Sequence, residues 1–182
     1  ATFYSISNCQ EGLSRVTLGN FLIKRVVYEI QEELPHIKNF GTLSPIPGFA
    51  EWFSYLEENK IKNILGNLTN QNVSFLKSKD LKIGDNRIIE NKDAIMKLVA
   101  HYIVNEKNQK GLPANDVSRF HLGNGAIVDD IVVNANVSEA GFERSFGVMV
   151  NYLYELKNIE KNHEYYMNNN QVIVSDKIKK CL

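Results

Sequence analysis

The chain has few of the residues that mark specialised classes of protein. Two of its 182 residues are cysteines, Cys9 and Cys181 at opposite ends, and they form no Cys-x-x-Cys pair. We therefore expect neither a disulfide framework nor a metal site, and the sparse cysteine favours a reducing compartment. No apolar run approaches the roughly 20 residues that a membrane-spanning helix needs, and no secretory signal is visible.

The chain also has a formal net charge of zero. Twenty-one Lys and Arg residues balance 21 Asp and Glu residues, so bulk charge predicts no nucleic-acid partner and no membrane-surface partner. The composition, 43% hydrophobic and 23% charged, is typical of a globular protein. The length suffices for one domain with a buried core, and we predict a single domain over residues 1–182.

The first part of the sequence predicts a strand, a helix and a second strand. Alternating residues in Phe3–Ser7 indicate a short strand, and Leu18–Leu34 carries an apolar helical face that ends at Pro35. Asn39–Leu43 reads as the second strand, parallel to the first because a helix connects them. Ser44 follows that strand at the edge where such sheets bind ligands. The alternative is a serine that begins a Ser-Pro turn.

The charges of the first helix oppose its dipole. Lys24 and Arg25 lie early in the helix, after Gly19. Two cations beside the free backbone amides of a helix start are typical of a phosphate site. Pairing between Arg25 and Glu29, four positions apart, explains the same charges without a ligand. The residues alone leave both interpretations open.

The rest of the chain alternates helices, strands and polar loops. Loops and short helices are expected in the Asn- and Lys-rich region 60–92. The other predicted elements are helices over Ala50–Asn59 and Lys92–Gln109, strands over Ala126–Val137 and Phe146–Tyr152, and a charged helix ending near Tyr166.

A histidine and a tyrosine join Ser44 as candidate site residues. His121 is expected at the lip of a strand, before two glycines that permit unusual backbone angles, and histidine is the usual carrier of a proton near neutral pH. A surface histidine in a β-turn is the alternative. Tyr154 adds a phenol. No acid lies near these residues in the sequence and no Gly-x-Ser-x-Gly surrounds Ser44, which disfavours a hydrolase triad. These three residue types are better suited to a reaction that binds a carboxylate and then delivers a proton.

Longer motifs point to a family. The segments are Phe3–Ser7, Leu18–Val27, Leu43–Phe49 (Leu-Ser-Pro-Ile-Pro-Gly-Phe), Arg119–Ala126 (Arg-Phe-His-Leu-Gly-Asn-Gly-Ala) and Met149–Tyr154. They are ordered and spread over most of the chain, which closely resembles the C-terminal catalytic part of the malonyl-CoA decarboxylase family.

The resemblance implies an α/β fold (α+β mixed) of the GNAT acyltransferase type, in which coenzyme A enters between two splayed parallel strands. The first helix would receive the pyrophosphate at its start, with Gly19, Asn20, Lys24 and Arg25 as coenzyme-binding positions. No cofactor beyond the coenzyme A moiety of the substrate is implied, and no metal.

The implied activity is that of a carboxy-lyase of fatty acid metabolism, which converts malonyl-CoA to acetyl-CoA and CO2. By the resemblance the catalytic residues are Ser44, His121 and Tyr154. In the preferred mechanism Ser44 and Tyr154 hold the malonyl carboxylate while His121, as imidazolium, protonates the enolate. In the alternative, His121 acts as a base on Ser44.

The resemblance also implies a longer protein. An N-terminal helical domain and the first strands of the catalytic domain would precede Ala1, and the full-length form would be a cytoplasmic homo-oligomer. Without those strands we expect an unpaired sheet edge and a chain that is poorly soluble or inactive alone. A GNAT-type, coenzyme A-dependent acyltransferase acting on an amine, and an inactive truncated relic, are the competing functions.

Overall fold

The computed structural model describes residues 1–3, 19–68 and 71–182, except for the side chains of 19–22. The predicted strand Phe3–Ser7 therefore lies largely outside the described residues. The elements, in chain order, are β1 (Thr2–Phe3), α1 (Gly19–Glu33), β2 (Gly41–Pro45), α2 (Phe49–Tyr55), α3 (Glu58–Leu65), the 3-10 turns η2 (Gly66–Leu68) and η3 (Ser74–Lys77), α4 (Asn86–Glu90), α5 (Lys92–Val104), α6 (Asp116–Gly123), β3 (Ile127–Val132), α7 (Glu139–Ser145), β4 (Met149–Leu153), α8 (Ile159–Asn169) and α9 (Asp176–Lys179).

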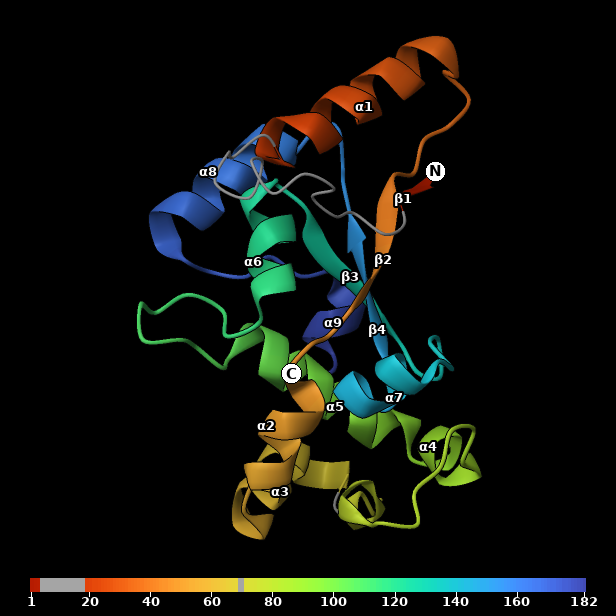
Figure 1. Ribbon diagram of the computed structural model, residues 1–182. Helices are drawn as coiled ribbons and strands as arrows, with labels where there is room; N and C mark the ends of the chain where they lie inside the picture. The colour runs from red at the N-terminus through yellow and green to blue at the C-terminus, as the bar shows by residue number, and fades with distance from the viewer. Residues whose placement is uncertain (4–18, 69–70) are drawn as a thin grey trace, which may run out of the picture.

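Within the described residues, four strands form one mixed sheet in the order β1-β2-β4-β3 (Figure 1). β1 and β2 are parallel, as predicted from the intervening helix. β4 runs antiparallel between β2 and β3, and β3 carries a bulge between Val128 and Asp130. The register pairs Thr42 with Tyr152 and Ser44 with Val150, so these four side chains belong to one face of the sheet.

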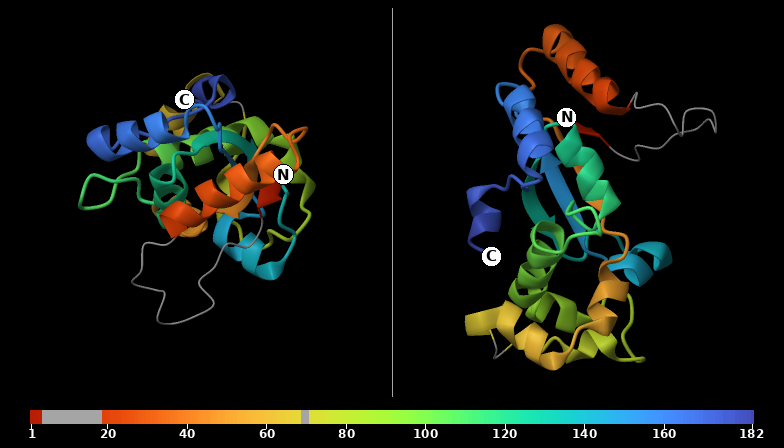
Figure 2. Two further views of the ribbon diagram at one scale, coloured as in Figure 1. Left: turned by 90° about the horizontal axis from the view of Figure 1, so that it is seen from above. Right: turned by 90° about the vertical axis from the view of Figure 1, so that its left-hand side faces the viewer.

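Helices cover the two faces and both ends of the sheet. The right-hand view of Figure 2 shows α6 and α9 on opposite sides of it. α9 is fixed to β3 by an ion pair between Lys177 and Asp130, while α6 covers the face that carries Ser44. Figure 1 shows α1 at one end of the molecule, next to α8, and α2 to α5 at the other.

Aromatic residues build the core at the end where α2 to α5 lie. The ring of Phe49 contacts those of Trp52, Phe53, Tyr102 and Phe146. These contacts connect helix α2 with helix α5 and with the end of α7. Directly before Phe49, Gly48 has a φ of 84°, and a Cβ there would lie 2.8 Å from the Tyr102 hydroxyl. The turn after β2 therefore needs glycine for its conformation and for the space.

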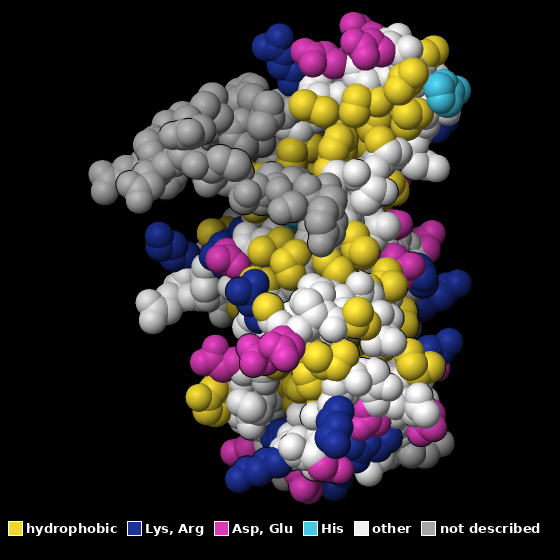
Figure 3. Space-filling view, turned by 45° about the vertical axis from the view of Figure 1, so that its right-hand side comes forward, with side chains coloured by type: hydrophobic (Ala, Val, Ile, Leu, Met, Phe, Trp, Pro, Cys, Tyr) yellow, Lys and Arg dark blue, Asp and Glu magenta, His cyan; other side chains and the backbone are white. Residues whose placement is uncertain are grey.

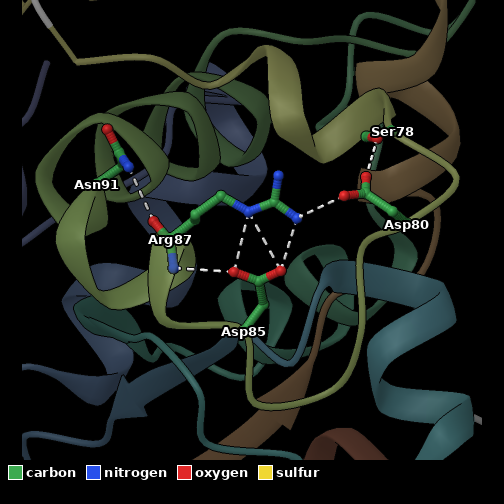
Figure 4. A network of polar contacts seen from close by, with 5 residues as sticks. All are labelled: Ser78, Asp80, Asp85, Arg87 and Asn91. Carbon is green, nitrogen blue, oxygen red and sulfur yellow. Dashed lines mark hydrogen bonds and ion pairs between the residues drawn. The ribbon is translucent and has the colours of Figure 1, made fainter.

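The polar region 60–92 folds into loops and short helices, as predicted. Figure 4 shows the ionic network that orders it. Asp85 caps α4 by accepting from the backbone N–H of Arg87, and the Arg87 guanidinium returns to the same carboxylate at 2.7 Å. This bonding lowers the pKa of the Asp85 carboxyl. Arg87 also lies over the ring of Phe75, so the network closes over the end of the apolar core.

Several predicted boundaries are wrong. β2 begins at Gly41 and ends at Pro45, so Ser44 lies inside the strand and not after it. His121 belongs to helix α6 and is buried, where a strand lip or an exposed turn was expected. The strand predicted over Ala126–Val137 ends at Val132. The short helices α7 and α9 were not predicted from the sequence.

Hydrophobic side chains also reach the surface. Figure 3 shows them gathered along α1 and the segment after it, where Tyr28 and Leu34 are exposed. In the part of the chain that the structure describes, no helix combines the length and the apolar character needed to cross a bilayer.

Candidate active site

Ser44 and Tyr154 both lie within hydrogen-bond distance of the His121 ring. The Oγ atom of Ser44 is 2.9 Å from Nε2 of His121, and the hydroxyl oxygen of Tyr154 is 2.8 Å from Nδ1 of the same ring. Ser44 comes from β2, His121 from α6, and Tyr154 is the first residue after β4. Their exposed fractions are 6%, 3% and 1%, so the imidazole is held at both nitrogens inside the protein.

The sheet register explains why two of these side chains meet the third. Ser44 and Thr42 are alternate residues of β2 and belong to the same face as Tyr152 in β4. Tyr154, two residues beyond Tyr152, continues that alternation, and its backbone N–H donates to the carbonyl of Phe40 at 2.7 Å. Because α6 packs on this face, a histidine near the end of the helix reaches both strands.

Counting hydrogens selects one tautomer of His121. Ser44 donates its hydroxyl hydrogen to Oγ1 of Thr42 at 3.1 Å, so its oxygen must accept from Nε2–H. Nδ1 then accepts from the hydroxyl of Tyr154. The opposite tautomer would reverse the bond between Ser44 and Thr42 and would leave the Tyr154 hydrogen without an acceptor among the described residues. An unpaired buried donor costs about 1–3 kcal/mol.

Burial keeps the site neutral. It lowers the pKa of His121 to about 3, and it raises the pKa of Tyr154, with a smaller contribution from the charge of Tyr152. Desolvation disfavours the charged form of both groups. At neutral pH the site therefore holds a neutral imidazole and a neutral phenol.

A phenol occupies the position that a carboxylate takes in a hydrolase triad. A triad carboxylate accepts from Nδ1–H and stabilises the imidazolium that forms when the serine is deprotonated. Tyr154 instead donates to Nδ1, and the Nε2–H of His121 points at Ser44. This arrangement presents a proton at Nε2 and offers no lone pair there to deprotonate the serine.

The predicted coenzyme-binding residues lie on α1, which begins at Gly19; the side chain of Asn20 lies outside the described residues. Lys24 forms an ion pair with Glu160 of α8 at 3.1 Å, and Arg25 pairs with Glu29 at 2.8 Å. A cavity of about 500 Å³ lies between the two helices and is lined by Lys24, Arg25, Tyr28, Glu29, Glu32, Glu160 and His163. The Arg25–Glu29 pair that the sequence suggested is present, and binding of phosphate stays a prediction.

Three further residues at this site were not predicted from the sequence. Thr42 accepts from Ser44, Tyr152 stacks on His121, and Ser118 bonds to Tyr152. Each lies at a periodic offset from a predicted residue: two positions along a strand for Thr42 and Tyr152, and three along a helix for Ser118. Residues at those offsets share a face, so the spacing was the available signal.

A known protein family matches this chain over its whole length. The family model described as the malonyl-CoA decarboxylase C-terminal domain matches residues 1–182. The mitochondrial malonyl-CoA decarboxylases of Rattus norvegicus and Anser anser anser are 36% and 35% identical over 98% of this chain. The chain spans only 40% and 39% of their respective lengths.

Solved structures agree with the sequence relatives. Malonyl-CoA decarboxylase from Cupriavidus metallidurans superposes with a TM-score of 0.81 at 38% identity, over 100% of this chain and 48% of that one. The Rhodopseudomonas palustris structure gives 0.78 at 38% identity, over 99% and 41%. These relatives confirm the mixed α/β class and the GNAT-like fold that the resemblance implied. The chain therefore belongs to the malonyl-CoA decarboxylase family and corresponds to its C-terminal domain.

Proposed function

We propose that the natural protein carrying this chain decarboxylates malonyl-CoA to acetyl-CoA and CO2, and that this chain supplies the catalytic residues. The observation that carries the proposal is the buried hydrogen-bonded series Tyr154–His121–Ser44 in a member of this family. It combines two hydroxyl groups suited to a carboxylate with one group suited to proton transfer.

The reaction breaks the bond between the malonyl carboxylate carbon and the α-carbon. The electron pair passes into the thioester as an enolate, and CO2 leaves. Ser44 and Tyr154 turn their hydroxyl hydrogens toward the carboxylate and orient that bond. His121 then transfers a proton to the α-carbon, which gives acetyl-CoA, and regains a proton from solvent.

Burial makes His121 a strong proton donor once it is charged. In the free protein the imidazole is neutral, because burial lowers its pKa to about 3. The negative charge of a bound carboxylate favours the imidazolium and so raises the pKa of His121. Binding of the substrate is therefore accompanied by protonation of the ring. After CO2 leaves, proton transfer converts a buried ion pair of enolate and imidazolium into two neutral groups. The same desolvation that disfavours the imidazolium therefore favours this transfer.

Coenzyme binding by α1 is the second part of the proposal. The phosphates of coenzyme A would approach the start of α1, with Gly19, Asn20, Lys24 and Arg25 near them. Support comes from Lys24 and Arg25, which both line the adjoining cavity; the three glutamates that also line it oppose an anion and would have to turn away. Lys24 would exchange its exposed partner Glu160 for a phosphate. No cofactor beyond the coenzyme moiety is proposed, and the full-length protein is proposed to be a homo-oligomer.

The proposed cellular location remains the cytoplasm. The curated relatives from rat and goose carry the word mitochondrial in their names, whereas the solved relatives come from bacteria, which have no mitochondria.

The test measures release of CO2 and acetyl-CoA from malonyl-CoA by the natural full-length protein, with His121→Ala beside it. We expect the wild type to be active and the variant to lose at least about 100-fold in kcat. His36→Ala, which changes an exposed histidine, is the matched control and should keep full activity. If His121→Ala matches the wild type, the reaction stands and the site assignment fails. Acetyl transfer to an amine without CO2 release would establish an acyltransferase, and inactivity in both assays would indicate a relic.

A further inference from the structure

A second buried network lies behind the imidazole of His121. The ring of Tyr152 stacks on it, with centroids 4.3 Å apart and an angle of 21° between the planes. Ser44 and Tyr154 fix the two nitrogens, while Tyr152 fixes the face of the ring. None of the three substrate-directed roles proposed above uses Tyr152.

The hydroxyl of Tyr152 is held by the helix that carries the histidine. It lies 2.7 Å from Oγ of Ser118, which is one turn before His121 on α6. Ser118 donates its single hydroxyl hydrogen to Oδ1 of Asn115 at 3.1 Å. Tyr152 is therefore the donor and Ser118 the acceptor in the bond between them. All three side chains are buried.

Asn115 links this network to the segment that follows Ser44. Its Oδ1 caps α6 by accepting from the backbone N–H of Ser118 at 2.9 Å. Its Nδ2 donates to the carbonyl of Pro47 at 2.8 Å, three residues after Ser44. The N–H of Ser118 and the carbonyl of Pro47 together fix the orientation of the Asn115 side-chain amide. One buried side chain thus connects the start of the histidine helix to the end of the serine strand.

We propose that Asn115, Ser118 and Tyr152 are positioning residues that set the plane of the His121 ring and its separation from Ser44. Asn115 holds α6 against the turn after β2, and Ser118 holds the phenol on which the imidazole rests. A 1 Å displacement of a reacting group can lower a rate about 100-fold, so this control of geometry is large enough to matter. The kinetic part of the inference rests on the proposed decarboxylation, whereas the geometric part does not.

The geometric part is tested by NMR on the natural protein labelled with ¹⁵N-histidine. The chain contains four histidines, and His121→Gln assigns the ring signals of the one at issue. We expect Tyr152→Phe and Ser118→Ala each to shift the His121 ring nitrogens. The matched control is Ser145→Ala, which removes a buried serine hydroxyl that bonds to Gly141 and Val148, and it should leave those signals in place.

The kinetic part uses the same variants. Tyr152→Phe and Ser118→Ala should each lower kcat about 10-fold and leave KM within about twofold of the wild type. The reason is that misplacement of the His121 ring slows proton transfer and does not alter substrate binding. The double variant should be no slower than either single one, since both changes remove one interaction. Ser118→Thr, which keeps a hydroxyl, should recover most of the rate. Asn115→Ser keeps a capping group but loses the reach to Pro47, and should also lower kcat.

Two results would overturn the proposal. One is an unshifted His121 spectrum in both Tyr152→Phe and Ser118→Ala. The other is a set of rate losses that Ser145→Ala reproduces, which would reduce the network to general stability. A wild type that releases no CO2 would refute the proposed function alone, because the His121 signals would still report whether the network positions the ring.

Discussion

The Nε2 atom of His121 lies 2.9 Å from Oγ of Ser44, and the serine hydrogen is directed to Thr42. The two catalytic candidates are therefore joined by a bond in which the histidine donates. This direction bears on the two mechanisms that the sequence left open, because a nucleophilic serine would need His121 to accept. The resting arrangement favours a serine that binds and orients the carboxylate.

Removing the serine hydroxyl tests that direction. Ser44→Ala should lower kcat about 10–100-fold and leave measurable CO2 release, because an orienting hydrogen bond is lost while the proton donor remains. Ser145→Ala, a buried serine of α7 outside the site, should retain the rate of the wild type. Mass spectrometry during turnover should find no acyl group on Ser44. An acylated Ser44 would establish the nucleophilic mechanism instead.

The pH dependence of kcat/KM should reveal the low pKa of His121. Burial lowers this pKa from 6.5 to about 3 in the free protein, so the protonated form becomes scarcer at every step from pH 6 to pH 8. If the reacting complex requires the imidazolium, kcat/KM should fall by up to about tenfold per pH unit across this range. A histidine of ordinary pKa would give a plateau below about pH 6.5. A pH-independent kcat/KM would contradict a reacting complex that requires the imidazolium of His121.

The same histidine should make the fold sensitive to mild acid. Its pKa is about 3 when folded and 6.5 in the reference state, so the unfolded chain binds more protons between these values. The free energy of unfolding should therefore fall as the pH decreases below about 6.5, by at most about 1.4 kcal/mol per pH unit.

Denaturant unfolding at pH 7, 6 and 5 of the wild type and of His121→Gln isolates this contribution, since the other three histidines are common to both. The variant should lose less stability than the wild type on going from pH 7 to pH 5. Parallel losses in the two proteins would show that His121 is not buried as a neutral ring.

Local patterns predicted the regular parts of this fold. The apolar face of α1 and the stop at Pro35 gave a helix close to the observed Gly19–Glu33, and the strand-helix-strand order gave the parallel pair. These features depend on periodicity and on the chemistry of proline, both of which are visible in a short stretch of sequence.

The site helix was not predictable in the same way. α6 is short, and its buried residues include the polar Ser118 and His121, which interrupt an apolar pattern. They are buried because Tyr152 of β4, 34 positions from Ser118, and Ser44 of β2, 77 positions from His121, satisfy them. The sequence Gly123-Asn124-Gly125 predicts a turn, and it does end the helix, but Asn115, which caps the helix, is the one local sign that seven helical residues precede Gly123.

The glycine after that helix supports a last prediction. Gly125 has a φ of +81°, and a methyl group there would overlap the backbone carbonyl of Ile159, where α8 begins. The turn therefore lies in close contact with the backbone of α8. Gly125→Ala should lower the free energy of unfolding by roughly 3 kcal/mol or more, from the left-handed backbone and from displacement of α8. Gly111→Ala has a similar φ of +74° and open space around it, so it should cost only about 1 kcal/mol. Equal losses in chemical denaturation would show that the contact with Ile159 does not constrain the turn that follows His121.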